Sequence, residues 1–173
     1  ESGGDPRMPW KVREIDRIPT AHRLRVLRLG GSSAIVNAPL TEATAEPPEY
    51  RGVVPLMFYR PPEWKREPIE STVSGVLHGI LVFDWDGDGK DELLTASFQG
   101  LHLFRRTRSG AWKQEQLSAG DPAPWPKSGS SEIAVGRLGK QRFLASIDPW
   151  HGNQVSVYRK SGRVWDRQVI DNT

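Results

Sequence analysis

Short apolar stretches separated by turn residues make up most of this chain. The apolar residues recur at alternate positions or in short dense runs, as they do in half-buried and buried β-strands. No apolar pattern with the period of a helix is sustained, and 14 Pro and 17 Gly would interrupt one. The pattern predicts an all-β protein with paired strands at residues 24–29 and 34–38, 80–83 and 93–97, and 133–135 and 142–147.

Four tryptophans mark a repeat along the chain: Trp10, Trp64, Trp112 and Trp165. Each is followed five residues later by an aliphatic residue, and successive members are 54, 48 and 53 residues apart. This period is typical of the four-stranded antiparallel blade of a β-propeller, whereas helical repeats are shorter, at about 33 to 47 residues. We therefore expect each of these tryptophans to lie in the outer strand of a blade.

Aromatic–basic pairs close another strand before each of the last three tryptophans: Tyr59-Arg60, Phe104-Arg105 and Tyr158-Arg159. A turn follows each pair, so the same hairpin is predicted three times. The expected fold is a single partial β-propeller spanning 1–173, with about three complete blades plus one outer strand. Its parts are an outer strand of a preceding blade at 10–16 and blades at 22–71, 76–119 and 131–173.

Three blades and one strand do not close a ring, since propellers have about four to eight blades. The chain begins at Glu1 without an initiator Met or a signal peptide, which indicates a processed chain or a piece of a longer one. We expect the remaining propeller blades to come from preceding sequence, with closure by a second copy of the chain as the alternative.

Composition excludes several classes of protein. The 173 residues include 36% hydrophobic residues, enough for a globular unit, and no apolar run approaches the roughly 18 to 20 residues of a membrane span. The absence of Cys excludes disulfides and thiolate chemistry. The net charge of +3 comes from scattered Lys and Arg residues, and a nucleic-acid-binding surface would cluster them.

The segment 84–92, Asp-Trp-Asp-Gly-Asp-Gly-Lys-Asp-Glu, carries a candidate metal site. The carboxylates of Asp84, Asp86 and Asp88, the carbonyl of Lys90 and the carboxylate of Glu92 can supply the oxygens that Ca²⁺ requires. Mg²⁺ fits less well because it demands stricter octahedral geometry, and a solvated acidic turn without an ion is the simpler alternative. Flanking strands, in place of an exiting helix, distinguish this loop from a helix–loop–helix calcium site.

Three histidines are candidate catalytic residues. His22 and His78 each lie two residues before an inner strand, at the end that faces a propeller's channel, and His151 lies in a turn beside Trp150. They could hold a second divalent metal, Zn²⁺ or Mg²⁺, or act as acid and base. Hydrogen bonding to the backbone is the alternative for the first two, and His102, in an alternating strand, is expected to be structural.

Three further residues are candidate ligand contacts: Asp148, Trp150 and Trp125. The two tryptophans break the repeat register and are therefore better candidates for sugar stacking than the repeated ones. Asp148 could orient His151 or join a sugar-binding rim, although Asp-Pro is also an ordinary turn sequence. Two long segments, 41–52 and 121–130, carry no strand pattern, and long loops inside compact repeats are usually functional or mobile. The second joins two blades and could cover one mouth of the channel.

Two family resemblances follow from these motifs. The stretch from Val82 to Leu94, ending at Phe104, resembles an FG-GAP or VCBS-type repeat, which implies one propeller blade with a calcium loop between its first two strands. The corresponding turns at 28–31 and 137–140 lack carboxylates, so one ion per chain is expected.

The segment 147–155, Ile-Asp-Pro-Trp-His-Gly-Asn-Gln-Val, together with His22 and His78, is similar to the propeller part of aldos-2-ulose dehydratase-like proteins. That resemblance implies lyases that remove water from keto-sugars with the help of a bound metal. The third blade departs from the pattern, since Ser131 stands where the first two blades have His. The cupin domains of the best-known members are also not in this sequence.

Two functional hypotheses result. The first is a calcium-stabilised propeller module from an exported protein, secreted, periplasmic or extracellular, that binds a carbohydrate-type ligand at the channel mouth. The alternative is a metal-assisted carbon–oxygen lyase that acts on a keto-sugar through His22, His78 and His151. The metal hypothesis requires the three imidazoles to lie within about 5 to 8 Å of a common point. An adhesion propeller of the integrin type would repeat the calcium loop in several blades.

Overall fold

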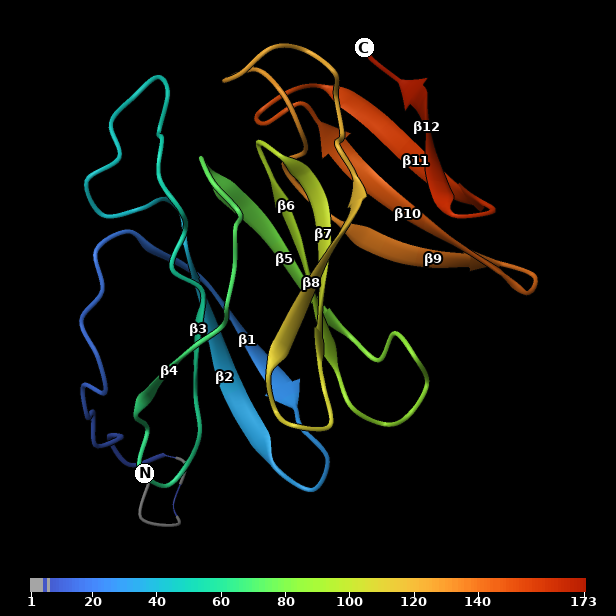
Figure 1. The fold of residues 1–173 in the computed structure, drawn as a ribbon. Coiled ribbons are helices and arrows are strands. Elements are labelled where there is room, and N and C mark those ends of the chain that lie inside the picture. Colours follow the sequence, from blue (N-terminus) through green and yellow to red (C-terminus); the bar gives the residue numbers. More distant parts are fainter. Residues whose placement is uncertain (1–4, 6) are drawn as a thin grey trace.

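The computed structural model describes residue 5 and residues 7–173, and the start of the chain at residues 1–4 and 6 lies outside the described part. The described residues form strands and connecting loops and contain no helix (Figure 1). The strands of the first sheet are β1 (Ala21–Arg28), β2 (Ser33–Pro39), β3 (Met57–Tyr59) and β4 (Arg66–Pro68). Those of the second are β5 (Leu77–Phe83), β6 (Glu92–Ser97), β7 (Gly100–Arg106) and β8 (Trp112–Ser118). The third contains β9 (Ala134–Leu138), β10 (Gln141–Asp148), β11 (Gln154–Ser161) and β12 (Val164–Asp171).

Each sheet is an antiparallel meander in which consecutive strands are hydrogen-bonded neighbours. We call the three sheets blade 1, blade 2 and blade 3 in chain order. Four antiparallel strands joined by short hairpins are the unit of a β-propeller blade. This architecture confirms the predicted all-β class and the predicted β-propeller segment.

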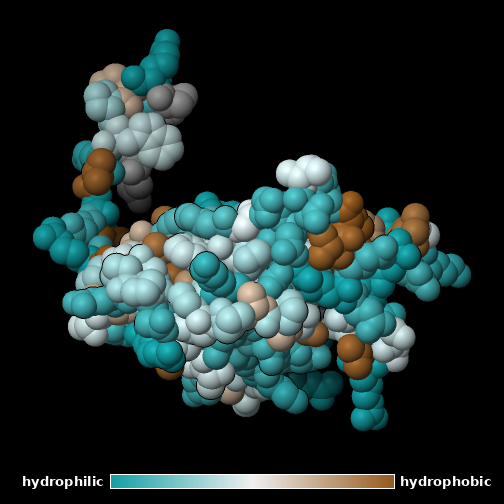
Figure 2. All heavy atoms as spheres, turned by 90° about the horizontal axis from the view of Figure 1, so that it is seen from above, coloured by the Kyte–Doolittle hydropathy of each residue, from teal (hydrophilic) through white to brown (hydrophobic). Residues whose placement is uncertain are grey.

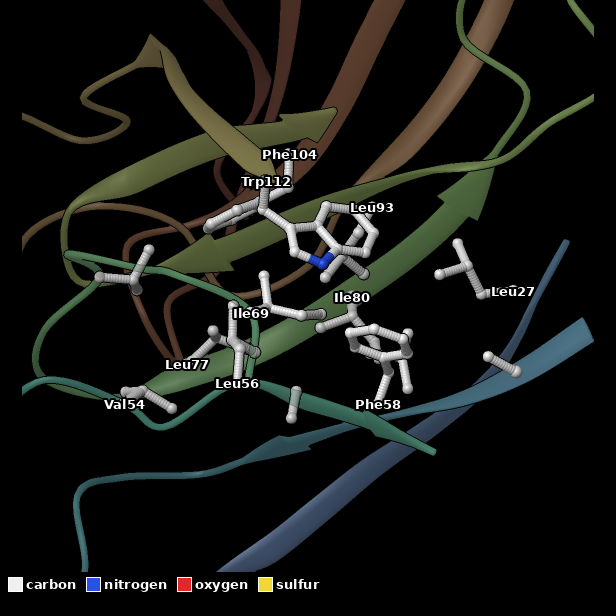
Figure 3. Packing of buried hydrophobic residues seen from close by; sticks show 14 residues of the cluster. Leu27, Val54, Leu56, Phe58, Ile69, Leu77, Ile80, Leu93, Phe104 and Trp112 are labelled. Atoms are coloured by element: carbon white, nitrogen blue, oxygen red, sulfur yellow. The ribbon is translucent and has the colours of Figure 1, made fainter. Parts of the chain in front are cut away.

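The core consists of two apolar layers, one between each pair of neighbouring blades. Between blades 1 and 2, Phe58 packs edge-on against Trp112 at 5.9 Å between ring centroids, and Leu27 and Ile80 close the same layer (Figure 3). Between blades 2 and 3, a second cluster is built around Leu94 and Tyr158 among others. Blade 2 is therefore buried on both faces, which explains why every residue of β6 is buried.

The segment that leads into each blade is tied to the outer strand of the same blade. Asp16 accepts hydrogen bonds from Arg66 in β4, and Asp121 accepts one from Arg167 in β12. In blade 2, Gln114 of β8 accepts from the backbone N–H and the hydroxyl of Thr72. The three outer-strand residues occupy the same register, each opposite the aromatic member of an aromatic–basic pair. The repeat is thus visible in polar contacts as well as in strands.

Two expectations drawn from the tryptophan repeat are wrong. No strand forms at 10–16, because the described residues of this segment have no neighbouring strand to pair with, and Trp10 is 66% exposed. Trp64 lies in the turn between β3 and β4 with a φ of 55°. Only Trp112 and Trp165 lie buried in outer strands as predicted.

The surface seen from above is largely hydrophilic, with hydrophobic side chains gathered in separate groups toward one side and on the projecting N-terminal segment (Figure 2). Within the described part of the chain, no helix has the length and apolarity needed to span a membrane.

Candidate functional site

Backbone irregularities in two inner strands place His22 and His78. The β1–β2 pairing shifts register between Ala21 and Arg23, and the β5–β6 pairing shifts between Leu77 and Gly79, so each histidine is the unpaired residue. A β-bulge of this kind redirects a side chain and is common next to active sites. Since β1 and β5 lie side by side, both imidazoles project at the same end of the blades.

The three candidate histidines form a continuous row. The ring centroids of His22 and His78 are 5.1 Å apart, and those of His78 and His151 are also 5.1 Å apart. Trp150 stacks on His151 with 4.4 Å between centroids and 21° between planes. We call His22, His78 and His151 the histidine row. The turn after β10 therefore carries its imidazole onto the ring at the start of β5, 73 residues earlier in the sequence.

The proton on His78 can be assigned from its neighbours. Nδ1 lies 3.0 Å from the carbonyl oxygen of Ser131 and 3.4 Å from its hydroxyl. Because a carbonyl oxygen only accepts, Nδ1 carries the proton and donates it to that oxygen. The neutral ring then has its lone pair on Nε2. Ser131, the blade 3 counterpart of His22 and His78, thus orients the central histidine.

Burial and nearby positive charge favour the neutral imidazole at His22 and at His78. Desolvation lowers the pKa of His22 and of His78, and the guanidinium of Arg23 acts in the same direction on both. Arg23 is held beside them by a hydrogen bond from Nε to the carbonyl oxygen of His78, at 2.9 Å. A neutral imidazole can accept a proton or donate its lone pair to a metal.

An aromatic cluster continues from the histidine row. Tyr50, Phe98 and Trp150 contact one another edge-on at centroid distances of 5.0 to 6.4 Å, and Phe98 meets Trp125 at 5.0 Å. Trp125 donates its indole N–H to the carbonyl oxygen of Glu49. Both predicted ligand-binding tryptophans therefore lie in one cluster connected to the histidines. The Nε1 atom of Trp150 is buried and has no hydrogen-bond partner among the described residues.

Sequence reasoning did not identify Arg23, Tyr50 or Phe98 as parts of this site. Tyr50 lies in the long segment 41–52, so the length of that insertion was the available signal. Its φ of 45° is uncommon for a side chain of this size. Arg23 directly follows His22, and nothing in its sequence position separates it from other basic residues in strands.

The three histidines meet the distance that the metal hypothesis requires. The ring centroids of His22 and His151 each lie 5.1 Å from that of His78. Nevertheless, in the described part of the chain no three His, Cys, Asp or Glu side chains are arranged to hold an ion. The second divalent metal therefore remains a prediction.

Asp148 does not belong to a ligand-binding rim, which corrects the prediction for this residue. It is 0% exposed, because its β10 position faces blade 2. Its carboxylate accepts hydrogen bonds from the hydroxyl of Tyr158 at 2.6 Å, from Nε of Arg167 at 2.7 Å and from the hydroxyl of Ser146 at 2.8 Å. These contacts occupy both oxygens, so Asp148 stabilises blade 3.

The acidic loop between β5 and β6 has its carboxylates engaged within the protein. Asp84 accepts the backbone N–H groups of Gly87 and Gly89, whose positive φ angles allow the tight turn. Asp88 accepts both the backbone N–H and the ammonium group of Lys90. These side chains are not gathered into a cage among the described residues.

Negative charge is nevertheless concentrated at the inner end of this loop. Glu92 is buried and accepts the backbone N–H of Trp85. Burial raises the pKa of Glu92, and the nearby charges of Asp86 and Asp88 raise it further. Asp86 itself lies 3.6 Å from Nε of Arg105. A bound cation would favour the ionised form of all these carboxylates.

The fold and the site define the class of this protein as a β-propeller segment with an aromatic, histidine-bearing face. Residues 1–161 match the family described as "Aldos-2-ulose dehydratase, beta-propeller domain", and the chain belongs to this family. It is similar to aldos-2-ulose dehydratase of Phanerodontia chrysosporium, with 26% identity over 196 aligned residues. The alignment covers 99% of this chain and 21% of that enzyme, so the chain spans about a fifth of the relative's length.

Proposed function

We propose that this chain is a carbohydrate-binding β-propeller module whose ligand is a keto-sugar bound at the histidine row and the adjoining aromatic cluster. The observation that carries the proposal is the stack of Trp150 on His151 beside His78. A flat indole offers an apolar surface to the face of a sugar ring, while neutral imidazoles can exchange hydrogen bonds with hydroxyl and carbonyl groups. The similar enzyme is named for an aldos-2-ulose, which suggests the class of sugar.

A titration with two sugars tests this proposal. The chain should bind an aldos-2-ulose more tightly than the parent aldose, as measured by calorimetry or by the chemical shifts of the Trp and His side chains. Trp150→Ala should weaken binding about tenfold or more, since stacked aromatic contacts contribute on the order of 1 kcal/mol or more beyond area burial. Trp10→Ala is the matched control, because Trp10 is exposed and lies in the N-terminal segment. Equal effects of both substitutions would remove the aromatic cluster as the binding site.

The assigned tautomer of His78 favours a second candidate function, a lyase that removes water from the bound keto-sugar. Nε2 of His78 would take the proton from the carbon next to the carbonyl group, and the released electron pair would form a carbon–carbon double bond. The bond to the hydroxyl group one carbon further would break, and this group would leave as water with a proton from His151. In this mechanism, His78 and His151 would carry both proton transfers.

Formation of a conjugated enone, followed by ultraviolet absorbance, tests the lyase reaction. His78→Gln should abolish the absorbance change and retain part of the sugar affinity, since the amide can still hydrogen bond. If the unaltered chain binds the sugar and yields no enone, the lyase reaction is rejected and the binding function stands.

We also propose that the loop at 84–92 binds one Ca²⁺ as an FG-GAP or VCBS-type loop does, through Asp84, Asp86, Asp88, the Lys90 carbonyl and Glu92. Support comes from the spacing of the carboxylates, from the glycines at positive φ and from the raised pKa of Glu92. Since sites in extracellular modules have dissociation constants of about 0.1 to 1 mM, such an ion fits an exported protein.

Apolar residues on the free face of blade 1 support a further partner. Leu24 and Val26 are 61% and 64% exposed on the side of β1 opposite Leu27, which contacts blade 2. We infer that this face packs against other propeller blades or against a second copy of the chain. Sedimentation of the 19.4 kDa chain distinguishes the two partners. Only packing against a second copy of the chain predicts a dimer.

A further inference from the structure

A cavity lies at the opposite end of the blades from the histidine row. His78 stands at the start of β5, whereas Trp85, in the wall of this cavity, follows the end of the same strand. The cavity has a volume of about 460 Å³, within the usual range for small-molecule sites. Its walls come from the β5–β6 loop of blade 2 and from the β9–β10 and β11–β12 hairpins of blade 3. We call it the Arg142 pocket.

The lining of the Arg142 pocket is apolar with a positive rim. Trp85 and Trp165 meet at 5.9 Å between ring centroids and form the apolar wall beside Arg142, and Leu138 and Phe143 are also lining residues. The charged lining residues are Arg142, Arg159 and Lys160, and none of the lining residues that the structure describes is Asp or Glu. A site with this lining would favour a ligand that combines a ring with a negative charge.

Arg142 is positioned to recognise an anion. Its guanidinium lies 4.3 Å from the ring centroid of Trp85 and donates one hydrogen bond, from Nη2 to the carbonyl oxygen of Trp85. Its Nε is buried and has no hydrogen-bond partner among the described residues, although a guanidinium offers five N–H donors. A buried donor without a partner is costly, and a carboxylate of a ligand would satisfy it.

Arg142 and its basic neighbours Arg137 and Lys160 are not neutralised by an ion pair with any described carboxylate. Arg137 stands directly opposite Arg142 in the β9–β10 pairing, and like charges in this relationship destabilise a sheet. Burial lowers the pKa of Arg142, and Arg137 lowers it further, while Asp86 and Asp84 act in the opposite direction.

We propose that the Arg142 pocket binds an aromatic carboxylate, with the carboxylate on Arg142 and Lys160 and the ring against Trp85 and Trp165. A sugar acid has the same charge, but the apolar lining suits an aromatic ring better than a ring covered with hydroxyl groups. This site is separate from the histidine row, so it does not depend on the function proposed for that row.

Four probes test the proposal by ligand-observed NMR on the full chain. Benzoate should bind at least tenfold more tightly than benzyl alcohol, which lacks the charge, and than sulfate, which lacks the ring. Glucuronate, which has the charge on a polar ring, should also bind more weakly than benzoate. If sulfate or glucuronate matches benzoate, the pocket selects charge alone and the proposal is overturned.

Substitutions locate the binding. Arg142→Gln should weaken benzoate binding about tenfold, because a charge-assisted hydrogen bond is lost. Arg13→Gln removes the same charge from the exposed N-terminal segment and should have no effect. If Arg142→Gln does not fold, the exposed Lys160→Gln replaces it, with an expected weakening of about threefold. A result in which the variants at 142 and 160 both match the Arg13 control contradicts the proposal.

Discussion

Arg28 at the end of β1 and Asp91 before β6 form a two-sided junction between blades 1 and 2. Nη2 of Arg28 donates to Oδ1 of Asp91 at 2.7 Å, the Nε atom donates to the same carboxylate, and the Arg28 backbone N–H donates to Oδ2 at 2.7 Å. In return, the backbone N–H of Asp91 donates to the carbonyl oxygen of Arg28. Blade 1 therefore holds the last part of the acidic loop in place, even though its own equivalent turn lacks carboxylates.

Removal of the Arg28 guanidinium should destabilise the protein. Burial works to raise the pKa of Asp91, but the hydrogen bonds from Arg28 outweigh it and hold that pKa below its ordinary value. Arg28→Gln should lower the free energy of unfolding by about 2 kcal/mol, less than for a fully buried pair because the arginine side chain is largely exposed. Urea denaturation measures the change. Arg25→Gln in the same strand is the control, and an equal loss there would contradict the role of the junction.

Calcium should stabilise the chain if the acidic loop binds it. Ca²⁺ at about one hundred times its dissociation constant should raise the free energy of unfolding by about 2.7 kcal/mol, because the ion binds the folded state. Asp86→Asn should abolish this response, while Glu70→Gln, an exposed acid outside the loop, should retain it. Thermal melts with and without Ca²⁺ provide the measurement. An unchanged response in Asp86→Asn would falsify the calcium assignment.

His102 should make stability depend on pH. It is 4% exposed between blades 1 and 2, and burial lowers its pKa to about 4, so the unfolded chain, with a histidine pKa near 6.5, binds the proton more tightly. Its contribution is complete above about pH 6.5 and is lost as the pH falls toward 4, by an amount on the order of 3 kcal/mol.

The dependence on His102 can be isolated by substitution. His102→Phe should flatten the plot of unfolding free energy against pH between 4 and 6.5, whatever its effect on absolute stability. His22→Gln should preserve most of the slope, because His22 is exposed. The assignment fails if the two variants change the slope equally.

Asp148 should act through blade 3 stability. Asp148→Asn removes the charge that Arg167 and Tyr158 share, and it should cost about 3 kcal/mol because the arginine then lacks a buried partner. Asp166→Asn, an exposed change in the same blade, should cost less than about 0.5 kcal/mol. Chemical denaturation of both variants decides between a structural role and a ligand-binding one, since a ligand-binding role predicts little loss of stability.

Much of the fold followed from local patterns. The strand pairs of each blade could be predicted because alternation along a strand reports which face is buried. The tryptophan repeat was a weaker guide, since Trp64 shares the sequence spacing of Trp112 but lies in a turn. Spacing identifies repeated positions, whereas pairing partners decide whether a position becomes a strand.

The candidate site was only partly accessible from the sequence. His22 and His78 could be aligned by their positions before inner strands, and their shared bulge explains that alignment. Tyr50 and Phe98 could not be identified, because their contact depends on how a long loop of blade 1 folds over blade 2. Asp148 was predicted as a ligand contact, but it is buried. The sequence of one strand does not show which of its faces a neighbouring blade covers.

The sequence by itself determined the all-β class, the blade repeat and the acidic loop, since alternation, turn residues and carboxylate spacing act over a few neighbouring residues. The tertiary structure decided that His151 reaches His78, that Arg28 holds Asp91 and that Asp148 is buried. These contacts join residues of different strands or blades. They depend on how the sheets stack and twist, which the order of the residues along one strand does not specify.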